Sequence, residues 1–186
     1  MCARFIKVCI FILMCAGSTF TLKVIFERIR ITYLNEELVQ YAFVNVSRYE
    51  RKGDYYINFE FITKYPFSKS LMIHLLFYEY VSYRYERSFI EFHYNLCDFL
   101  TDPLIGAEFK KRGLECPIKP GKLYSYKNFT VYLDDFPNVF PYEKGLIKFE
   151  ITLMGSSNNT PIAEAFLHLS FKNRNKATKK NLTETH

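Results

Sequence analysis

Apolar and polar residues alternate along much of this chain. In residues 146–154, Ile147, Phe149, Ile151 and Leu153 alternate with Lys148, Glu150 and Thr152. A period of two places these two sets on opposite faces of a β-strand. The same criterion predicts strands at residues 21–33, 39–49, 55–61, 88–96, 124–133 and 162–171.

Residues 71–83 are harder to assign, because their first half is apolar on both faces. Periodicity alone does not distinguish a buried strand from a buried helix here. The tyrosines of this segment and its strand-like neighbours favour a strand. The chain is 49% hydrophobic, with 15 Tyr, 19 Phe and no Trp, which also favours pleated structure.

One short helix is predicted at residues 103–112. Asp102 and Pro103 form a helix-start pair, and Lys110, Lys111, Arg112 and Gly113 form a helix-stop signal. Charged residues at 50–54 and 84–87 predict turns between strands. Eight or nine short strands with little helix predict an all-β fold of two antiparallel sheets packed face to face.

The first 17 residues are typical of a signal peptide. Arg4 and Lys7 precede an apolar run at 8–16 and a small-residue cleavage site. An uncleaved anchor is the alternative, although the run is short for a membrane span. We therefore expect a secreted, extracellular protein with a single domain at residues 18–171 and a basic tail at residues 172–186.

The formal charge of +6 lies at the two ends of the chain. Arg4 and Lys7 carry +2 and residues 172–186 carry +4, so residues 18–171 are neutral. A neutral body argues against nucleic acid as a partner. The tail is either a solvated extension or a segment attracted to an anionic membrane surface or glycan.

Five cysteines become two after signal cleavage, because Cys2, Cys9 and Cys15 lie in the leader. In an oxidising compartment we expect Cys97 and Cys116 to form a disulfide. Closing a loop of about 20 residues stabilises the fold by about 3 kcal/mol. Two buried free thiols are the alternative.

The sequence contains no constellation that points to catalysis. The residues around Ser156 do not complete a G-x-S-x-G motif. His74, His93 and His168 lie singly on predicted strands, far apart and without metal-ligand spacing, and Asp134 and Asp135 are most simply a solvated pair. We expect no enzyme, no cofactor and no metal. Candidate glycosylation sites are Asn45, Asn128, Asn158 and Asn181, of which the first two lie in predicted strands and would have to point outward.

The segment Cys116-Pro117-Ile118, followed by Gly121 and Tyr124-x-Tyr126, resembles the ML lipid-recognition superfamily, which includes the ganglioside activator protein and the lysosomal cholesterol-transfer protein. With Asn95-x-Cys97-x-Phe99-Leu100 and Pro141, the pattern is similar to an insect secreted branch that contains the CheA and CheB chemosensory proteins. Many relatives carry an extra cysteine pair in the N-terminal strands, and residues 31–46 have none.

This resemblance implies an immunoglobulin-like sandwich whose sheets splay to leave an apolar cavity for a lipid or pheromone-like molecule. A sensory receptor or an anionic membrane would be a further partner. The alternative is an extracellular interaction module, filled by its own side chains, that acts through its surface or tail. The candidate lining residues are Phe59, Phe61, Ile73, Leu75, Phe77, Phe89, Phe149, Ile151 and Phe166.

Overall fold

The computed structural model describes residues 21–51, 53–103, 106–130, 143–155 and 158–174. The expected signal peptide, Ser156, Asp134, Asp135 and Asn181 lie outside these residues. The strands are β1 (Thr21–Leu34), β2 (Val39–Ser47), β3 (Tyr56–Thr63), β4 (Leu71–Val81), β5 (Arg84–Asn95), β6 (Tyr124–Phe129), β7 (Lys144–Leu153) and β8 (Thr160–Arg174), and the helices are α2 (Leu96–Phe99) and α3 (Gly106–Lys111).

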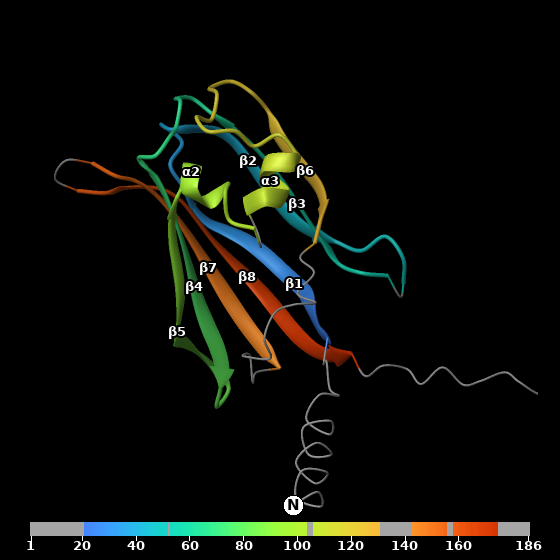
Figure 1. Ribbon diagram of the computed structural model, residues 1–186. Coiled ribbons are helices and arrows are strands. Elements are labelled where there is room, and N and C mark those ends of the chain that lie inside the picture. The colour runs from blue at the N-terminus through green and yellow to red at the C-terminus, as the bar shows by residue number, and fades with distance from the viewer. Residues whose placement is uncertain (1–20, 52, 104–105, 131–142, 156–157, 175–186) are drawn as a thin grey trace, which may run out of the picture.

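The strands form two antiparallel sheets, as the alternation predicts. One sheet has five strands in the order β1-β8-β7-β4-β5, and the other has three in the order β2-β3-β6. The turn after β1 brings β2 alongside it, since Val39 N donates to Asn35 O at 2.9 Å. The sheets therefore meet at the β1/β2 edge and diverge away from the helices, with β4 and β5 at the far edge (Figure 1). The predicted immunoglobulin-like sandwich is confirmed.

Side chains of alternate residues fill the space between the sheets. On β8, Leu167 and Leu169 are buried in one core cluster with Phe26, Ile57 and Phe129. A second cluster, at the helical end, contains Leu71, Leu96, Phe99, Tyr124 and Tyr126. Phe59 and Phe109 pack against both clusters. The interior is thus one continuous apolar layer, as two packed sheets require.

The two helices close the end of the sandwich that carries the disulfide. The side chain of Asn95 caps α2 by accepting a hydrogen bond from Asp98 N at 3.0 Å. Gly106 begins α3 where a Cβ would lie only 1.5 Å from the carbonyl oxygen of Phe99, so only glycine allows this approach. The predicted disulfide joins Cys97 to Cys116, with the Cα atoms 5.4 Å apart.

Two local predictions need correction. The turn expected at 84–87 lies at Ser82 and Tyr83, with φ of 50° and 68°, and β5 begins directly afterwards at Arg84. A two-residue hairpin turn with both φ positive usually carries Asn or Gly, so this turn has no sequence signal. The helix expected at 103–112 is the shorter α3, and α2 was not predicted because four residues show no periodicity.

Candidate functional site: an apolar cleft between the sheets

Aromatic rings fill the space between the small sheet and the helices. Phe59 stacks on Tyr126 with ring centroids 4.6 Å apart, and Phe109 of α3 stacks on Phe129 at 4.7 Å. Phe109 also lies 5.5 Å from Phe59 and 5.4 Å from Phe99. Such contacts add about 1 kcal/mol each beyond burial. This end of the interior is a packed core.

The opposite part of the interior is apolar but not fully covered. Leu75, Phe77 and Phe92 point inward from β4 and β5, yet they belong to neither core cluster of the described residues. Phe92 keeps 37% of its surface exposed. The cause is the unequal size of the sheets, since a three-stranded sheet joined at the β1 edge does not extend over β4 and β5.

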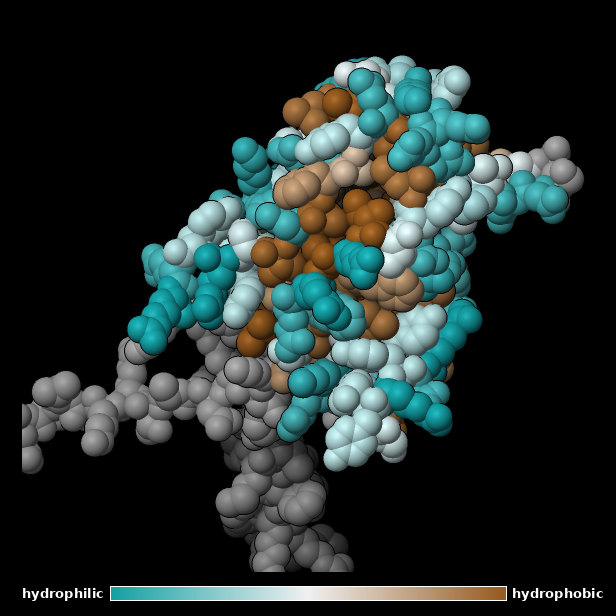
Figure 2. Space-filling view, turned by 180° about the vertical axis from the view of Figure 1, so that it is seen from behind, coloured by the Kyte–Doolittle hydropathy of each residue, from teal (hydrophilic) through white to brown (hydrophobic). Residues whose placement is uncertain are grey.

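Strand register places six inward side chains of β4, β5 and β7 next to one another, and three of them, Ile73, Phe149 and Ile151, also pack against the core clusters. Leu75 lies between Phe92 on β5 and Phe149 on β7, which leaves it only 4% exposed. Ile73 lies next to Ile151, and Phe77 contacts Phe92 edge to face at 5.9 Å. We call this surface the cleft, and define it by Ile73, Leu75, Phe77, Phe92, Phe149 and Ile151. The view from behind shows hydrophobic side chains in a hollow below the helical end, rimmed by hydrophilic residues (Figure 2).

The nine candidate lining residues separate into three groups. Ile73, Leu75, Phe77, Phe149 and Ile151 lie on the inward face that defines the cleft, and their contact with a ligand stays a prediction. Phe59 and Phe61 lie at the packed end, where Phe61 stacks on Tyr124 at 5.1 Å.

Phe89 and Phe166 do not line the cleft, and these two assignments are wrong. Phe89 is 85% exposed, beside a register irregularity in β5. Phe166 pairs with Lys148 on the outer face of the large sheet, where the Lys148 ammonium lies 5.6 Å from its ring. Sequence reasoning also missed Phe92, although it shares the parity of Tyr94 in a predicted strand.

Two buried hydroxyl groups in the interior lack hydrogen-bond partners within the described chain. They are Thr63 Oγ1 and Tyr126 Oη, and Tyr126 is only 2% exposed. Burial raises the pKa of Tyr126 well above its usual value, so the phenol stays protonated and can donate. Buried polar groups almost always have a hydrogen-bond partner, and these two hydroxyls have none among the described residues.

The expectation that the histidines lie far apart is wrong for two of them. Pairing of β4 with β5 puts His74 opposite His93 on the outer face, with their Nδ1 atoms 2.7 Å apart. Burial, followed by the charge of His93, lowers the pKa of His74. Even so, no cluster of three or more His, Cys, Asp or Glu residues suited to a metal ion occurs in the described ranges.

The three sequons that the structure describes carry exposed asparagines. Asn45 on β2, Asn128 on β6 and Asn158 before β8 are all solvent-accessible. Asn45 Oδ1 accepts a hydrogen bond from Asn58 Nδ2 at 3.0 Å. Asn45 and Asn128 are therefore exposed on their strands, as glycosylation requires.

A two-sheet sandwich with an apolar cleft along its open edge defines a protein built to hold a hydrophobic molecule. The ML domain family model matches residues 33–162, and the chain belongs to this family. The ML domain is a lipid-binding fold and not a known enzyme family, which gives this protein a hydrophobic-ligand-binding role. No curated protein matches the chain.

ML-domain proteins are generally extracellular or secreted. In the part of the chain that the structure describes, the helices have four and six residues, and none has the length and apolar character needed to cross a bilayer.

Proposed function

We propose that this protein is a secreted, non-enzymatic carrier that holds one hydrophobic molecule in the cleft. One observation carries the proposal: the inner face of β4 and β5 is apolar but extends beyond the small sheet, so Phe92 is 37% exposed. Apolar surface facing inward and still in contact with water gains free energy when an apolar ligand covers it.

The physics of burial sets the size of the ligand. Each buried CH2 contributes about 0.8 kcal/mol, and association costs at least about 4 kcal/mol in lost freedom. A micromolar complex needs about 8 kcal/mol net. A chain on the order of 15 carbons meets this requirement, so long-chain molecules are favoured over short volatile ones.

The two buried hydroxyl groups without hydrogen-bond partners in the described chain, Thr63 Oγ1 and Tyr126 Oη, favour a ligand that carries an oxygen atom. Tyr126 packs against Phe59 and Phe109 and has a buried phenol with no hydrogen-bond partner in the described residues. A fatty alcohol, ester or acid would satisfy this donor, whereas a pure hydrocarbon would not. We infer that the preferred ligand is a long-chain molecule with a single polar group.

Chemosensation, and pheromone response in particular, is the proposed setting. The support is the resemblance of residues 95–126 and Pro141 to the insect branch with the CheA and CheB proteins. In this setting the protein would deliver a fatty-acid-derived signal or cuticular hydrocarbon to a sensory receptor. A hydrocarbon signal would bind through the cleft alone and leave Tyr126 unsatisfied.

Displacement of a fluorescent fatty acid from the secreted protein tests the carrier function. A series of straight-chain alcohols should bind about fourfold more tightly per added CH2 until the cleft is filled, from 0.8 kcal/mol each. The matching alkanes should bind more weakly at each length. Failure of the fatty acid and of every alcohol to bind would refute the carrier function.

A surface-acting module is the second candidate, and the packed aromatic end favours it. Phe59, Phe109, Phe129 and Tyr126 leave that end filled, and Tyr41 and Phe43 are exposed on the outer side of the small sheet. In this case the protein would bind no apolar probe, and the Tyr41→Ser/Phe43→Ser variant would lose binding to its extracellular partner.

A further inference from the structure

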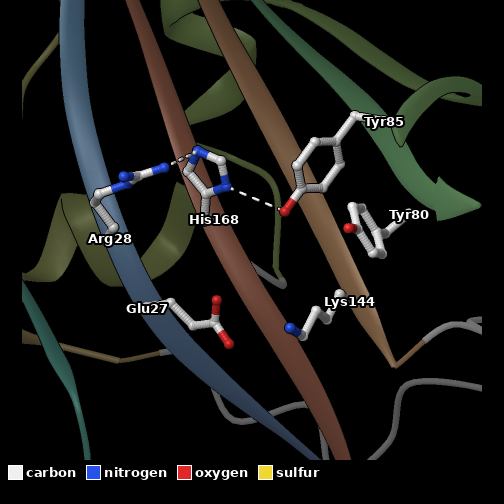
Figure 3. Close-up of a pocket in the computed structure, with 6 residues that line it drawn as sticks. All are labelled: Glu27, Arg28, Tyr80, Tyr85, Lys144 and His168. Carbon is white, nitrogen blue, oxygen red and sulfur yellow. Dashed lines mark hydrogen bonds between the residues drawn. The ribbon is translucent and has the colours of Figure 1, made fainter. Parts of the chain in front are cut away.

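A second pocket, of about 460 Å³, lies on the outer face of the five-stranded sheet. Its lining residues come from five strands: Glu27, Arg28, Tyr80, Tyr85, Lys144 and His168. It is separate from the cleft, because His168 alternates with the inward-pointing Leu167 and Leu169. Figure 3 shows these six side chains around a common space.

A hydrogen-bonded chain fixes the direction of the protons in this pocket. Arg28 Nη2 lies 3.1 Å from His168 Nε2, and His168 Nδ1 lies 3.2 Å from Tyr85 Oη (Figure 3). A guanidinium can only donate, so Nε2 must accept and the imidazole proton must lie on Nδ1. Nδ1 then donates to the Tyr85 oxygen, and the phenol proton remains available to a bound molecule.

The protonation state of His168 agrees with these hydrogen-bond directions. Burial, followed by the charge of Arg28, lowers the pKa of His168, which favours the neutral ring. The pocket charge then comes from Arg28, Lys144 and Glu27. None of these three forms an ion pair with another residue that the structure describes. Among the described residues, the pocket therefore carries one net positive charge that has no ion-pair partner.

The pocket also has an aromatic wall. The rings of Tyr80 and Tyr85 lie 5.1 Å apart, and the Lys144 ammonium lies 6.0 Å from the Tyr80 ring. Such rings cover the apolar part of a small ligand, and the volume is within the range of small-molecule sites. Glu27 disfavours ligands with two negative charges, since its carboxylate would repel them.

We propose that this pocket binds a small organic monocarboxylate with a flat apolar group. The carboxylate is held by Arg28 and Lys144 and accepts a hydrogen bond from the Tyr85 hydroxyl, while the apolar group lies against Tyr80 and Tyr85. The carrier would thereby have two separate sites, one for a long apolar molecule between the sheets and one for a small anion on the outer face.

Titration calorimetry of the whole protein with benzoate tests this site, with sulfate as a probe of charge alone. Benzoate should bind once per chain and more tightly than sulfate. Arg28→Gln should weaken benzoate binding about tenfold or more, because it removes a charge-assisted hydrogen bond. Arg30→Gln is the matched control, on the same strand and the same outer face but outside the pocket, and should leave the affinity unchanged.

Two further variants guard against a change in folding. Tyr85→Phe keeps the ring and removes the phenol hydroxyl, so it should weaken benzoate binding severalfold. Glu27→Gln removes the repelling carboxylate and should strengthen it. The proposal is overturned if benzoate does not bind, if Arg28→Gln has no more effect than Arg30→Gln, or if sulfate binds more tightly. Displacement of benzoate by saturating dodecanol would place the probe in the cleft and overturn it as well.

Discussion

Phe77 and Phe92 meet edge to face across β4 and β5, with centroids 5.9 Å apart and ring planes at 79°. Both point toward the interior, beyond the reach of the three-stranded sheet. An edge-to-face pair fixes the orientation of both rings, so the wall of the cleft is ordered before a ligand arrives. Preorganisation of this kind reduces the entropy lost on binding.

Phe92→Ala should weaken binding of a long-chain fatty acid about fivefold, from about 1 kcal/mol of lost apolar contact. Fluorescence titration measures this change. Phe89→Ala is the matched control, because Phe89 lies on the same strand but is 85% exposed outside the cleft. Equal effects of the two substitutions would contradict the assigned position of the ligand.

Tyr126→Phe should have opposite effects on stability and binding. Removing a buried hydroxyl without a partner should stabilise the free protein by about 1 kcal/mol in urea denaturation. The same change should weaken binding of a long-chain alcohol about two- to tenfold and leave the matching alkane unaffected. If alcohol and alkane respond alike, the phenol does not contact the ligand.

Loss of the disulfide should destabilise the fold without altering the cleft. The Cys97→Ala/Cys116→Ala variant removes a cross-link between residues 19 positions apart, worth about 3 kcal/mol. Urea denaturation of the oxidised protein and of this variant measures the difference. Where the variant remains folded, its affinity for fatty acid should match that of the unmodified protein. An unchanged free energy of unfolding would contradict the structural role.

Glu115 should make the fold sensitive to acid. Hydrogen bonds from Lys122 and Lys119, at 2.8 and 2.9 Å, lower the pKa of Glu115 from 4.5 to about 2. Because the pKa is lower in the folded state, this stabilisation is complete above pH 4.5 and declines as the pH falls toward 2. Melting temperatures measured across this range should fall less steeply for Glu115→Gln. Parallel curves would contradict the assigned contacts.

Strands with strict alternation could be predicted from the sequence. Ile147, Phe149 and Ile151 face inward and Lys148 and Glu150 outward, because the inward face of β7 packs against both core clusters. The disulfide could also be predicted, because Cys97 and Cys116 are the two cysteines that lie outside the expected signal peptide. Both features depend on local pattern or on counting, and neither needs strand register.

Features set by register could not be predicted. The contact between His74 and His93 depends on a β4–β5 turn at Ser82 and Tyr83, which has no turn signal, and on the register shift between Leu76 and Tyr78. Phe166 is an aromatic residue on a strand whose inward positions are mostly small or aliphatic, and register places it outside beside Lys148. A one-residue change in pairing would have reversed these assignments.

Periodicity also does not separate a packed core from a ligand cleft. Phe59 and Phe92 are both inward-facing aromatics on alternating strands, yet Phe59 stacks on Tyr126 and Phe92 remains partly exposed. The difference arises from the number of strands in each sheet, which is a property of the assembled sandwich.

Native mass spectrometry of the secreted protein, after exposure to a mixture of long-chain alcohols, acids and alkanes, tests the carrier function most directly. Our proposal predicts one bound molecule per chain, an excess of oxygen-bearing ligands over alkanes, and reduced occupancy in the Phe92→Ala variant but not in Phe89→Ala. A protein that emerges free of ligand across the whole mixture would contradict it.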